Sequence, residues 1–176
     1  MWIELDGWKA KLRFSACHII PYHKKCGRLH GHTYAVSVKI IGEQFGEFII
    51  DFEVVKQIVS ELCDKLDHRV LLAEKDPRLS FFKDKESVKV VIQNGKTYLF
   101  PLEDVVFLPI DSLSAEDLCK YFTKEIAKRL KVRSESDYEY SNLTKIYVRV
   151  DEGIGQGVGC ELDLQKRSVN RQSTPL

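Results

Sequence analysis

One alternating run constrains the fold of this protein more than any other part of it. From residue 34 to residue 40, apolar residues alternate with small or polar ones, which is the period of a half-buried β-strand. The segment Cys26-Gly-Arg-Leu-His30-Gly-His32 comes directly before this run. If the strand begins near His30, both imidazoles leave the same face, because side chains at i and i+2 do so. Two histidines on one face can bind a metal ion, and the nearby thiol is then either a further ligand or a catalytic group.

Length and composition narrow the class of protein. A length of 176 residues with a formal net charge of +1 predicts one globular domain. Acidic and basic residues are interspersed, so no basic stripe predicts nucleic-acid binding, and no apolar run approaches the length of a membrane span. The first residues do not have the pattern of a signal peptide. The five cysteines are scattered and odd in number, which is typical of a reducing compartment, and we therefore expect a cytoplasmic protein.

Other segments also have the period of strands. Residues 2–16 predict an extended strand or hairpin with a turn near Asp6-Gly7, and residues 143–150 and 160–164 predict two further strands. The strand that begins near His30 should turn at Gly42. Residues 88–92 and 97–100 predict a hairpin whose Asn94-Gly95 pair supplies the two positive φ values of a type I′ turn.

Two amphipathic helices complete the prediction. The first should begin after Asp51 as N-cap and end near Leu66, which brings Asp67-His68 to its C-terminal end. The second should begin after Ser114, with Asp117 in a variant of the capping box. We expect an α+β fold in which an antiparallel four-stranded sheet carries two helices on one face, with an inserted β-hairpin. The domain would span residues 1–164 with the insert at 75–112, and 165–176 would be a polar tail. Unpaired edges of such a sheet invite oligomerisation.

The histidines predict a metal centre. His18 follows a strand-like run, and together with His30 and His32 it would form a three-histidine site with an open fourth position, which is typical of catalytic zinc. Cys26 offers an alternative, a structural site in which its sulfur is a ligand. Neighbouring basic residues favour the thiolate and suit either role, so spacing does not decide between them. The neighbouring Cys17 should point to the opposite face of its strand and pack there.

Motifs along nearly the whole chain resemble those of a known family. In order, they are Phe14-Ser-Ala-Cys-His18, Lys25-Cys26-Gly-Arg-Leu-His30-Gly-His32-Thr-Tyr34, Gly46 to Asp51-Phe52, Leu66-Asp67-His68, Ser114-Ala-Glu116 and Val148-Arg-Val-Asp-Glu152. They resemble the 6-pyruvoyltetrahydropterin synthase and 6-carboxytetrahydropterin synthase family, and the Cys-x3-His-Gly-His spacing is similar to the 6-carboxy branch. That branch serves the biosynthesis of 7-deazaguanines (queuosine and archaeosine).

The resemblance implies a fold and a reaction. The fold would be the tunnelling fold, in which trimers close a β-barrel, two trimers stack into a hexamer, and active sites lie between subunits. Zn²⁺ bound by the three histidines would act on 7,8-dihydroneopterin triphosphate. The substrate would lose triphosphate and a two-carbon fragment as acetaldehyde, which leaves 6-carboxy-5,6,7,8-tetrahydropterin. The partner would thus be a small molecule, and this protein would be a lyase.

The resemblance also implies roles for single residues. Cys26 would be the base, His68 would relay protons, Asp67 would orient His68, and the Glu152 carboxylate would anchor the pterin ring by two parallel hydrogen bonds. For the remaining positions, a role in substrate binding and a purely structural role are equally good interpretations. Ser114 and Glu116 would bind substrate, or else cap the helix and interact with its dipole. Lys24, Lys25, Arg28 and Arg69 would meet the triphosphate, or else form a solvated basic face.

The sequence departs from the family pattern at Cys17, at Leu113-Ser114 and in the length of the insert. Two rival functions therefore stay open. One is 6-pyruvoyltetrahydropterin synthase activity on the same substrate. The other is a non-catalytic module that zinc stabilises through Cys26.

Overall fold

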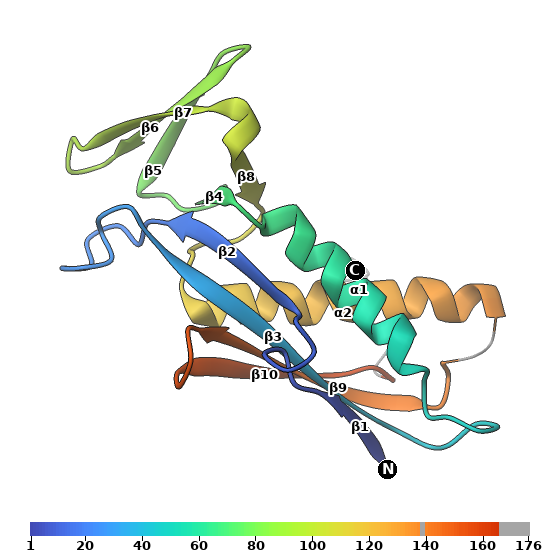
Figure 1. The fold of residues 1–176 in the computed structure, drawn as a ribbon. Helices are drawn as coiled ribbons and strands as arrows, with labels where there is room; N and C mark the ends of the chain where they lie inside the picture. Colours follow the sequence, from blue (N-terminus) through green and yellow to red (C-terminus); the bar gives the residue numbers. More distant parts are fainter. Residues whose placement is uncertain (138–139, 166–176) are drawn as a thin grey trace, which may run out of the picture.

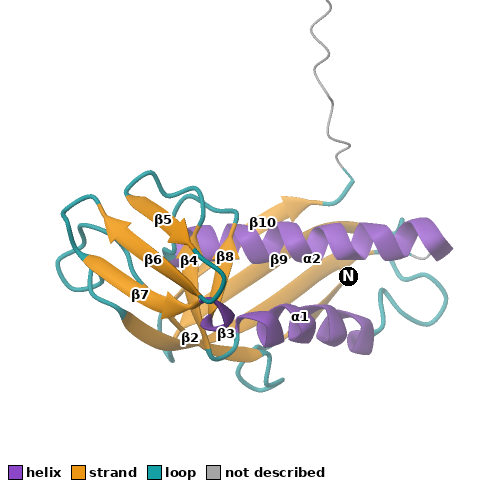
Figure 2. Cartoon of the chain, turned by 90° about the horizontal axis from the view of Figure 1, so that it is seen from above, coloured by secondary structure: helices purple, strands orange, loops and turns teal. Residues whose placement is uncertain are grey.

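A computed structural model of the protein describes residues 1–137 and 140–165 (Figure 1). A large sheet carries two helices, α1 (Phe52–Leu66) and α2 (Ala115–Asp137), on one face, and a small sheet stands at one end (Figure 2). This agrees with the α+β prediction. No helix in the described part is long and apolar enough to cross a membrane. Of the predicted polar tail, residues 166–176 lie outside the described residues.

The large sheet has seven strands in the order β10-β9-β3-β2-β4-β8, with β1 paired to β3. Their bounds are β1 (Trp2–Leu5), β2 (Arg13–His18), β3 (His30–Gly42), β4 (Arg69–Ala73), β8 (Val105–Leu108), β9 (Leu143–Glu152) and β10 (Gly157–Asp163). The predicted four-stranded antiparallel sheet was therefore wrong, since this sheet is mixed and does not close into a barrel within one subunit.

Two parallel strands account for the difference. β4 pairs in parallel with β2 after helix α1 crosses over between β3 and β4, and β8 pairs in parallel with β4 because the insert forms the crossover between them. Residues 70–73 form a continuous apolar run whose last three residues are buried, which is typical of a parallel strand and carries no period of two. Residues 2–16 also form no hairpin with each other, because β1 and β2 both pair with β3.

The insert is a three-stranded sheet, which consists of β5 (Leu79–Lys83), β6 (Ser87–Ile92) and β7 (Thr97–Pro101), followed by the 3₁₀ turn η1 (Leu102–Asp104). The predicted hairpin forms, but its turn is not type I′. Gly95 N donates to Ile92 O at 2.8 Å, Ile92 N donates to Lys96 O at 2.8 Å, and Gly95 has a φ of +87° while Asn94 has a negative one. This is a three-residue loop with one glycine in the left-handed region.

The core lies between the helices and the large sheet. Asp51 caps α1 by accepting a hydrogen bond from Glu53 N at 2.8 Å, as predicted. The apolar stripes of α1 and α2 are buried, although Val54 is only half-buried. Between the layers, the ring of Phe14 stacks on Tyr34 at 4.7 Å and on Phe122 at 5.7 Å. This packing holds β2 and β3 rigidly below α2, directly beside the histidines.

Candidate functional site

Three histidines meet where β2 ends and β3 begins. His18 lies directly opposite His30 in the antiparallel register, and His32 lies two residues further along β3. Their ring centroids are 4.5 Å (His18 to His30), 5.3 Å (His18 to His32) and 5.0 Å (His30 to His32) apart. One nitrogen from each ring lies within 4.8 Å of the others. The structure thus brings together the three side chains predicted to bind metal, with nitrogens close enough to share one ion.

Hydrogen bonds select the tautomer of two of these rings. His18 Nδ1 lies 2.9 Å from Leu113 O, and His30 Nδ1 lies 2.8 Å from Arg28 O. A carbonyl oxygen only accepts, so each Nδ1 carries the proton and each Nε2 keeps its lone pair. Both Nε2 atoms are buried and have no hydrogen-bond partner. Histidine ligands in metal sites are held in this way, and the donor set therefore fits a zinc ion.

Burial favours the neutral form of His18. Burial is the largest cause that lowers its pKa, the neighbouring His30 and, to a smaller extent, His32 also lower it, and against the opposing effect of the Leu113 carbonyl they bring the pKa from 6.5 to about 4. The imidazole of His18 is therefore uncharged at neutral pH. A metal ion needs the neutral form, so no proton has to be displaced from this ring when the ion binds.

Cys26 lies in the loop between β2 and β3, at residues 19–29. Its amide donates to His23 Nδ1 at 3.0 Å, and its side chain is half-buried. The group of ligand atoms within 4.8 Å of one another contains the three histidines and does not include the Cys26 sulfur. This geometry favours a thiol beside the metal centre over a thiol that coordinates it.

Tyr34 contacts both Glu152 and the histidine cluster, and this position between them was not predicted from the sequence. Tyr34 pairs with Glu152 across β3 and β9, and its hydroxyl donates to Glu152 Oε1 at 3.5 Å. Its buried ring lies 5.6 Å from the ring of His32. Burial raises the pKa of Tyr34, and the Glu152 carboxylate raises it further. The signal was present in the sequence, because the period of two places Tyr34 on the same face as His30 and His32.

Asp67 and His68 form the predicted pair. Asp67 Oδ2 lies 2.7 Å from His68 Nδ1, and Asp67 Oδ1 accepts from Ser15 N at 2.7 Å. Burial raises the pKa of Asp67, but the hydrogen bonds from Ser15 N and His68 outweigh it and hold that pKa below its usual value. His68 has a φ of +57°, and its side chain is 85% exposed. The carboxylate therefore orients the imidazole with Nδ1 protonated and Nε2 free.

However, His68 lies on the other side of the sheet from the metal centre. It lines a hollow of about 560 Å³ together with Ser15, Cys17, Gly31, His32 and Thr33. Apart from His32, these β2 and β3 residues alternate with the three histidines, so their side chains leave the opposite face. Cys17 does point away from the histidines, as predicted, and it is half-buried in this hollow. Within one subunit, the Asp67–His68 pair thus lies across the sheet from His18 and His30, while His32 borders the same hollow.

The remaining candidates surround the start of α2 and the loop. Ser114 Oγ accepts from Asp117 N at 3.3 Å, so Ser114 caps α2. The predicted capping box is indirect, because the Asp117 carboxylate does not accept from Ser114 N itself. Ser114 N donates to Ser112 Oγ, and Ser112 Oγ donates to the Asp117 carboxylate. Glu116 is exposed in the first turn of α2, and Lys24, Lys25 and Arg28 are exposed in the loop. Arg69 donates to the carbonyl of Glu103.

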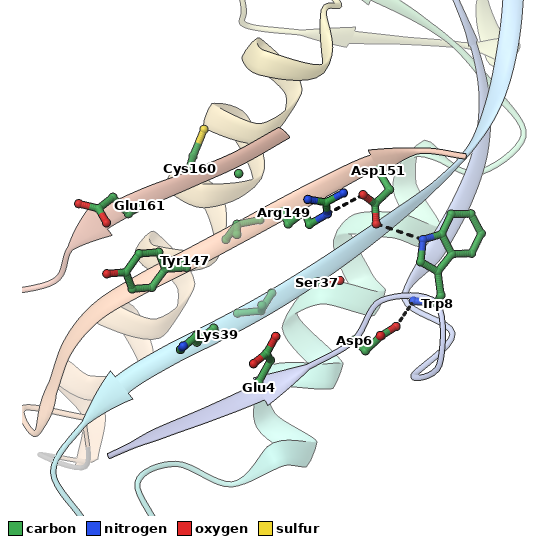
Figure 3. A pocket seen from close by; sticks show the side chains of 13 residues that line it. Glu4, Asp6, Trp8, Ser37, Lys39, Tyr147, Arg149, Asp151, Cys160 and Glu161 are labelled. Atoms are coloured by element: carbon green, nitrogen blue, oxygen red, sulfur yellow. Dashed lines mark hydrogen bonds and ion pairs between the residues drawn. The ribbon is translucent and has the colours of Figure 1, made fainter. Parts of the chain in front are cut away.

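A second hollow, of about 590 Å³, lies on the face of the large sheet that the helices do not cover (Figure 3). One of its lining residues is the buried Asp151, whose carboxylate accepts a hydrogen bond from Arg149 Nε at 2.7 Å and another from Trp8 Nε1 at 3.1 Å. None of the predicted site residues lines this hollow. It is therefore separate from the metal centre.

Comparison with known proteins gives these residues a context. A family model described as 6-pyruvoyl tetrahydropterin synthase matches residues 8–161. A relative from Methanocaldococcus jannaschii, which carries the provisional name 6-carboxy-5,6,7,8-tetrahydropterin synthase, is 43% identical over 159 residues, covering 89% of this chain and 94% of that protein. The 6-carboxy-5,6,7,8-tetrahydropterin synthase of Aquifex aeolicus is 32% identical over 128 residues, covering 70% of this chain and 72% of that protein.

A solved structure is also similar. The 6-pyruvoyl tetrahydropterin synthase of Plasmodium falciparum superimposes with a TM-score of 0.82 and 27% identity, over 93% of this chain and 98% of that one. The region that the family model matches includes every site residue predicted from the sequence.

Proposed function

Because the chain belongs to the 6-pyruvoyl tetrahydropterin synthase family, we propose that it is a zinc-dependent lyase acting on 7,8-dihydroneopterin triphosphate. Its products would be 6-carboxy-5,6,7,8-tetrahydropterin, acetaldehyde and triphosphate, with one water consumed. The reaction would serve 7-deazaguanine biosynthesis. Relatives named for the 6-carboxy product, from Methanocaldococcus jannaschii and Aquifex aeolicus, support this branch.

One observation carries the proposal, namely the two buried, unpartnered Nε2 atoms of His18 and His30. A buried nitrogen with no partner costs free energy, on the order of 1–3 kcal/mol. Coordination to a metal ion removes that cost. His18, His30 and His32 would hold the ion. Bound zinc would supply a Lewis acid for the hydroxyl and carbonyl oxygens of the substrate's three-carbon substituent.

The other residues would bind the substrate and move its protons. Glu152, beside the centre, would accept two hydrogen bonds from the pterin ring, and Ser114 and Glu116 would contact the substrate from the start of α2. The Cys26 thiolate would take the proton from a C–H bond of the three-carbon substituent, and His68 Nε2 would relay it, because Asp67 keeps Nδ1 protonated. Glu152 and Cys26 would thus act from the face that carries the metal centre.

We also propose that each site is shared between subunits of a tunnelling-fold hexamer. The support is the position of His68 across the sheet from His18 and His30 of its own subunit, whose side chains do not line the hollow of His68. A neighbouring subunit would then present its Asp67–His68 pair to the Cys26 of this one.

Mixing two inactive variants tests this sharing. His68→Ala and Cys26→Ala proteins, each inactive alone, should regain activity when unfolded and refolded together. At a one-to-one ratio, random association should restore about a quarter of the wild-type rate, because one site in four then receives both intact residues. No recovery in refolded mixed oligomers would show that each subunit builds its site alone.

Product analysis tests the reaction itself. The zinc-loaded protein with 7,8-dihydroneopterin triphosphate should release one acetaldehyde for each triphosphate. A 6-pyruvoyltetrahydropterin synthase would keep the three-carbon substituent as a dicarbonyl, so triphosphate without acetaldehyde would support that alternative. A stable zinc protein that releases neither product would support the non-catalytic module.

A second prediction concerns the pterin anchor. Glu152→Gln keeps the size of the residue but removes its charge and one acceptor, so KM should rise about tenfold or more while the metal content is unchanged. Steady-state kinetics and metal analysis of the same preparation measure both. Glu161→Gln is the matched control, because Glu161 is an exposed residue on the neighbouring strand β10 and binds Lys145. An unchanged KM in Glu152→Gln would remove Glu152 from the site.

A further inference from the structure

The insert packs against the loop that carries Cys26. That loop, residues 19–29, begins directly after His18 and ends directly before His30, so both of its ends are held by candidate metal ligands. Its own hydrogen bonds form local turns, in which Ile20 N donates to Cys26 O at 2.8 Å, Gly27 N donates to His23 O at 2.9 Å and Cys26 N donates to His23 Nδ1 at 3.0 Å. Most of its residues between 22 and 29 are exposed. These bonds shape the loop locally, and contacts with other parts of the protein fix where the loop as a whole lies.

Four hydrogen bonds from the insert hold it. Two of them contact loop residues before Cys26, and the other two contact loop residues after it. They join Tyr22 OH to Gln93 Oε1 (2.9 Å), Arg78 Nη1 to Pro21 O (3.2 Å), Lys96 Nζ to Gly27 O (3.4 Å) and Leu29 N to Tyr98 OH (3.3 Å). Tyr22 has a φ of +66°, a conformation that an aromatic residue rarely adopts without support from its surroundings.

The insert is rigid enough to act as a support. Ile19, the first residue of the loop, is 2% exposed and packs in a second core with apolar residues of β5, β6 and β7. Arg78 is held by the buried Asp76 through two bonds of 2.7 Å. The ring of Tyr98 stacks on Phe100 at 5.7 Å. Arg78 and Tyr98 are therefore held by their own contacts. The exposed Gln93 is held by hydrogen bonds from its N to Arg78 O (3.0 Å) and from its Nε2 to Pro77 O (3.2 Å).

We propose that the β5–β6–β7 sheet is a brace that positions the Cys26 thiol for proton abstraction, with Gln93 and Tyr98 as its positioning residues. This rests on the proposed role of Cys26 as base. A base works only within hydrogen-bond reach of the proton that it takes, so loosening the loop lowers turnover without removing any group that touches substrate. The insert thereby acquires a function in the reaction, although none of its residues takes part in the chemistry.

The test is the double variant Gln93→Leu/Tyr98→Phe in the zinc-loaded protein. It removes the acceptor for Tyr22 OH and the acceptor for Leu29 N, together with the bond from Gln93 Nε2 to Pro77 O (3.2 Å), and leaves the rings and the second core in place. Amide hydrogen exchange in residues 19–29 should become about tenfold faster, since each lost bond contributes modestly. The value of kcat should fall about tenfold, with KM and zinc content within twofold of wild type.

Two comparisons make the test specific. Gln93→Glu keeps an acceptor for Tyr22 OH and should retain most of the turnover that Gln93→Leu loses. Tyr147→Phe, an equal change in the hollow of Figure 3, which no residue of the insert or of the Cys26 loop lines, should alter neither exchange nor kcat. If the double variant folds poorly, Tyr22→Phe removes the first bond from the loop side and should have the same effect on a smaller scale.

Unchanged exchange in residues 19–29 would overturn the proposal, and so would faster exchange with unchanged kcat. Failure of the proposed function is seen separately, because the wild-type protein would then release no acetaldehyde, and failure of Cys26 as base is seen as full turnover in Cys26→Ala. Hydrogen exchange would still report whether the insert holds the loop.

Discussion

Cys26→Ala should lower turnover by about a thousandfold while one zinc ion per subunit stays bound. The loss is expected because positioned general bases contribute roughly 10²–10⁴-fold to rate. The metal should stay because the ligand nitrogens of His18, His30 and His32 form a group that does not include the Cys26 sulfur. Metal analysis and steady-state kinetics on one preparation measure both quantities.

Cys160→Ala is the control for this substitution. Cys160 is another half-buried free thiol, on β10, and it lines the separate hollow of Figure 3. Its replacement should change neither the zinc content nor the rate. If Cys26→Ala lost its metal and unfolded together, Cys26 would be a ligand of a structural site, and the non-catalytic alternative would be correct.

His30→Ala should abolish zinc binding at micromolar metal concentrations and reduce turnover to background. Changes to groups that only orient a ligand weaken metal affinity by about 10–100-fold, and removal of a ligand itself should exceed that. Zinc should also no longer raise the melting temperature, because a metal stabilises a protein only to the extent that it binds the native state. Equilibrium metal titration and thermal unfolding with and without zinc measure these effects.

His68→Ala separates metal binding from catalysis. His68 is exposed and lies on the opposite face of the sheet, so this variant should keep both its zinc and the zinc-dependent rise in melting temperature, but lose turnover. Full zinc occupancy in His30→Ala would contradict the proposed ligand set. Zinc loss in His68→Ala would mean that the pair takes part in metal binding.

Much of this site could be predicted because it depends on local patterns. The period of two through residues 34–40 placed His30 and His32 on one face, and the described strand β3 has that arrangement. The N-cap at Asp51 and the end of α1 at Leu66 also follow from local hydrogen bonding and burial. In each case the physical cause lies within a few residues of the effect, and a linear sequence therefore records it.

Other features depend on partners far along the sequence. The apolar run at residues 70–73 has no period of its own, and only pairing with β2 and β8 makes it a strand. Asn94-Gly95 predicted two positive φ values, but the register between β6 and β7 leaves a three-residue loop that needs only one. Tyr34 was read as a strand residue, and its contact with Glu152 arises from the register of β3 with β9.

By itself the sequence determined which side chains are candidates for metal binding and proton transfer, because residue type and spacing along one strand specify what can coordinate a metal or move a proton. Only the tertiary structure decided how these groups are distributed. His18 faces His30 because β2 and β3 pair in one register, and His68 faces away because it follows a helix that crosses over to a parallel strand. The insert reaches the Cys26 loop because its core includes Ile19. Such contacts join residues separated by tens of positions, and the free energy that selects them comes from packing that no short segment contains.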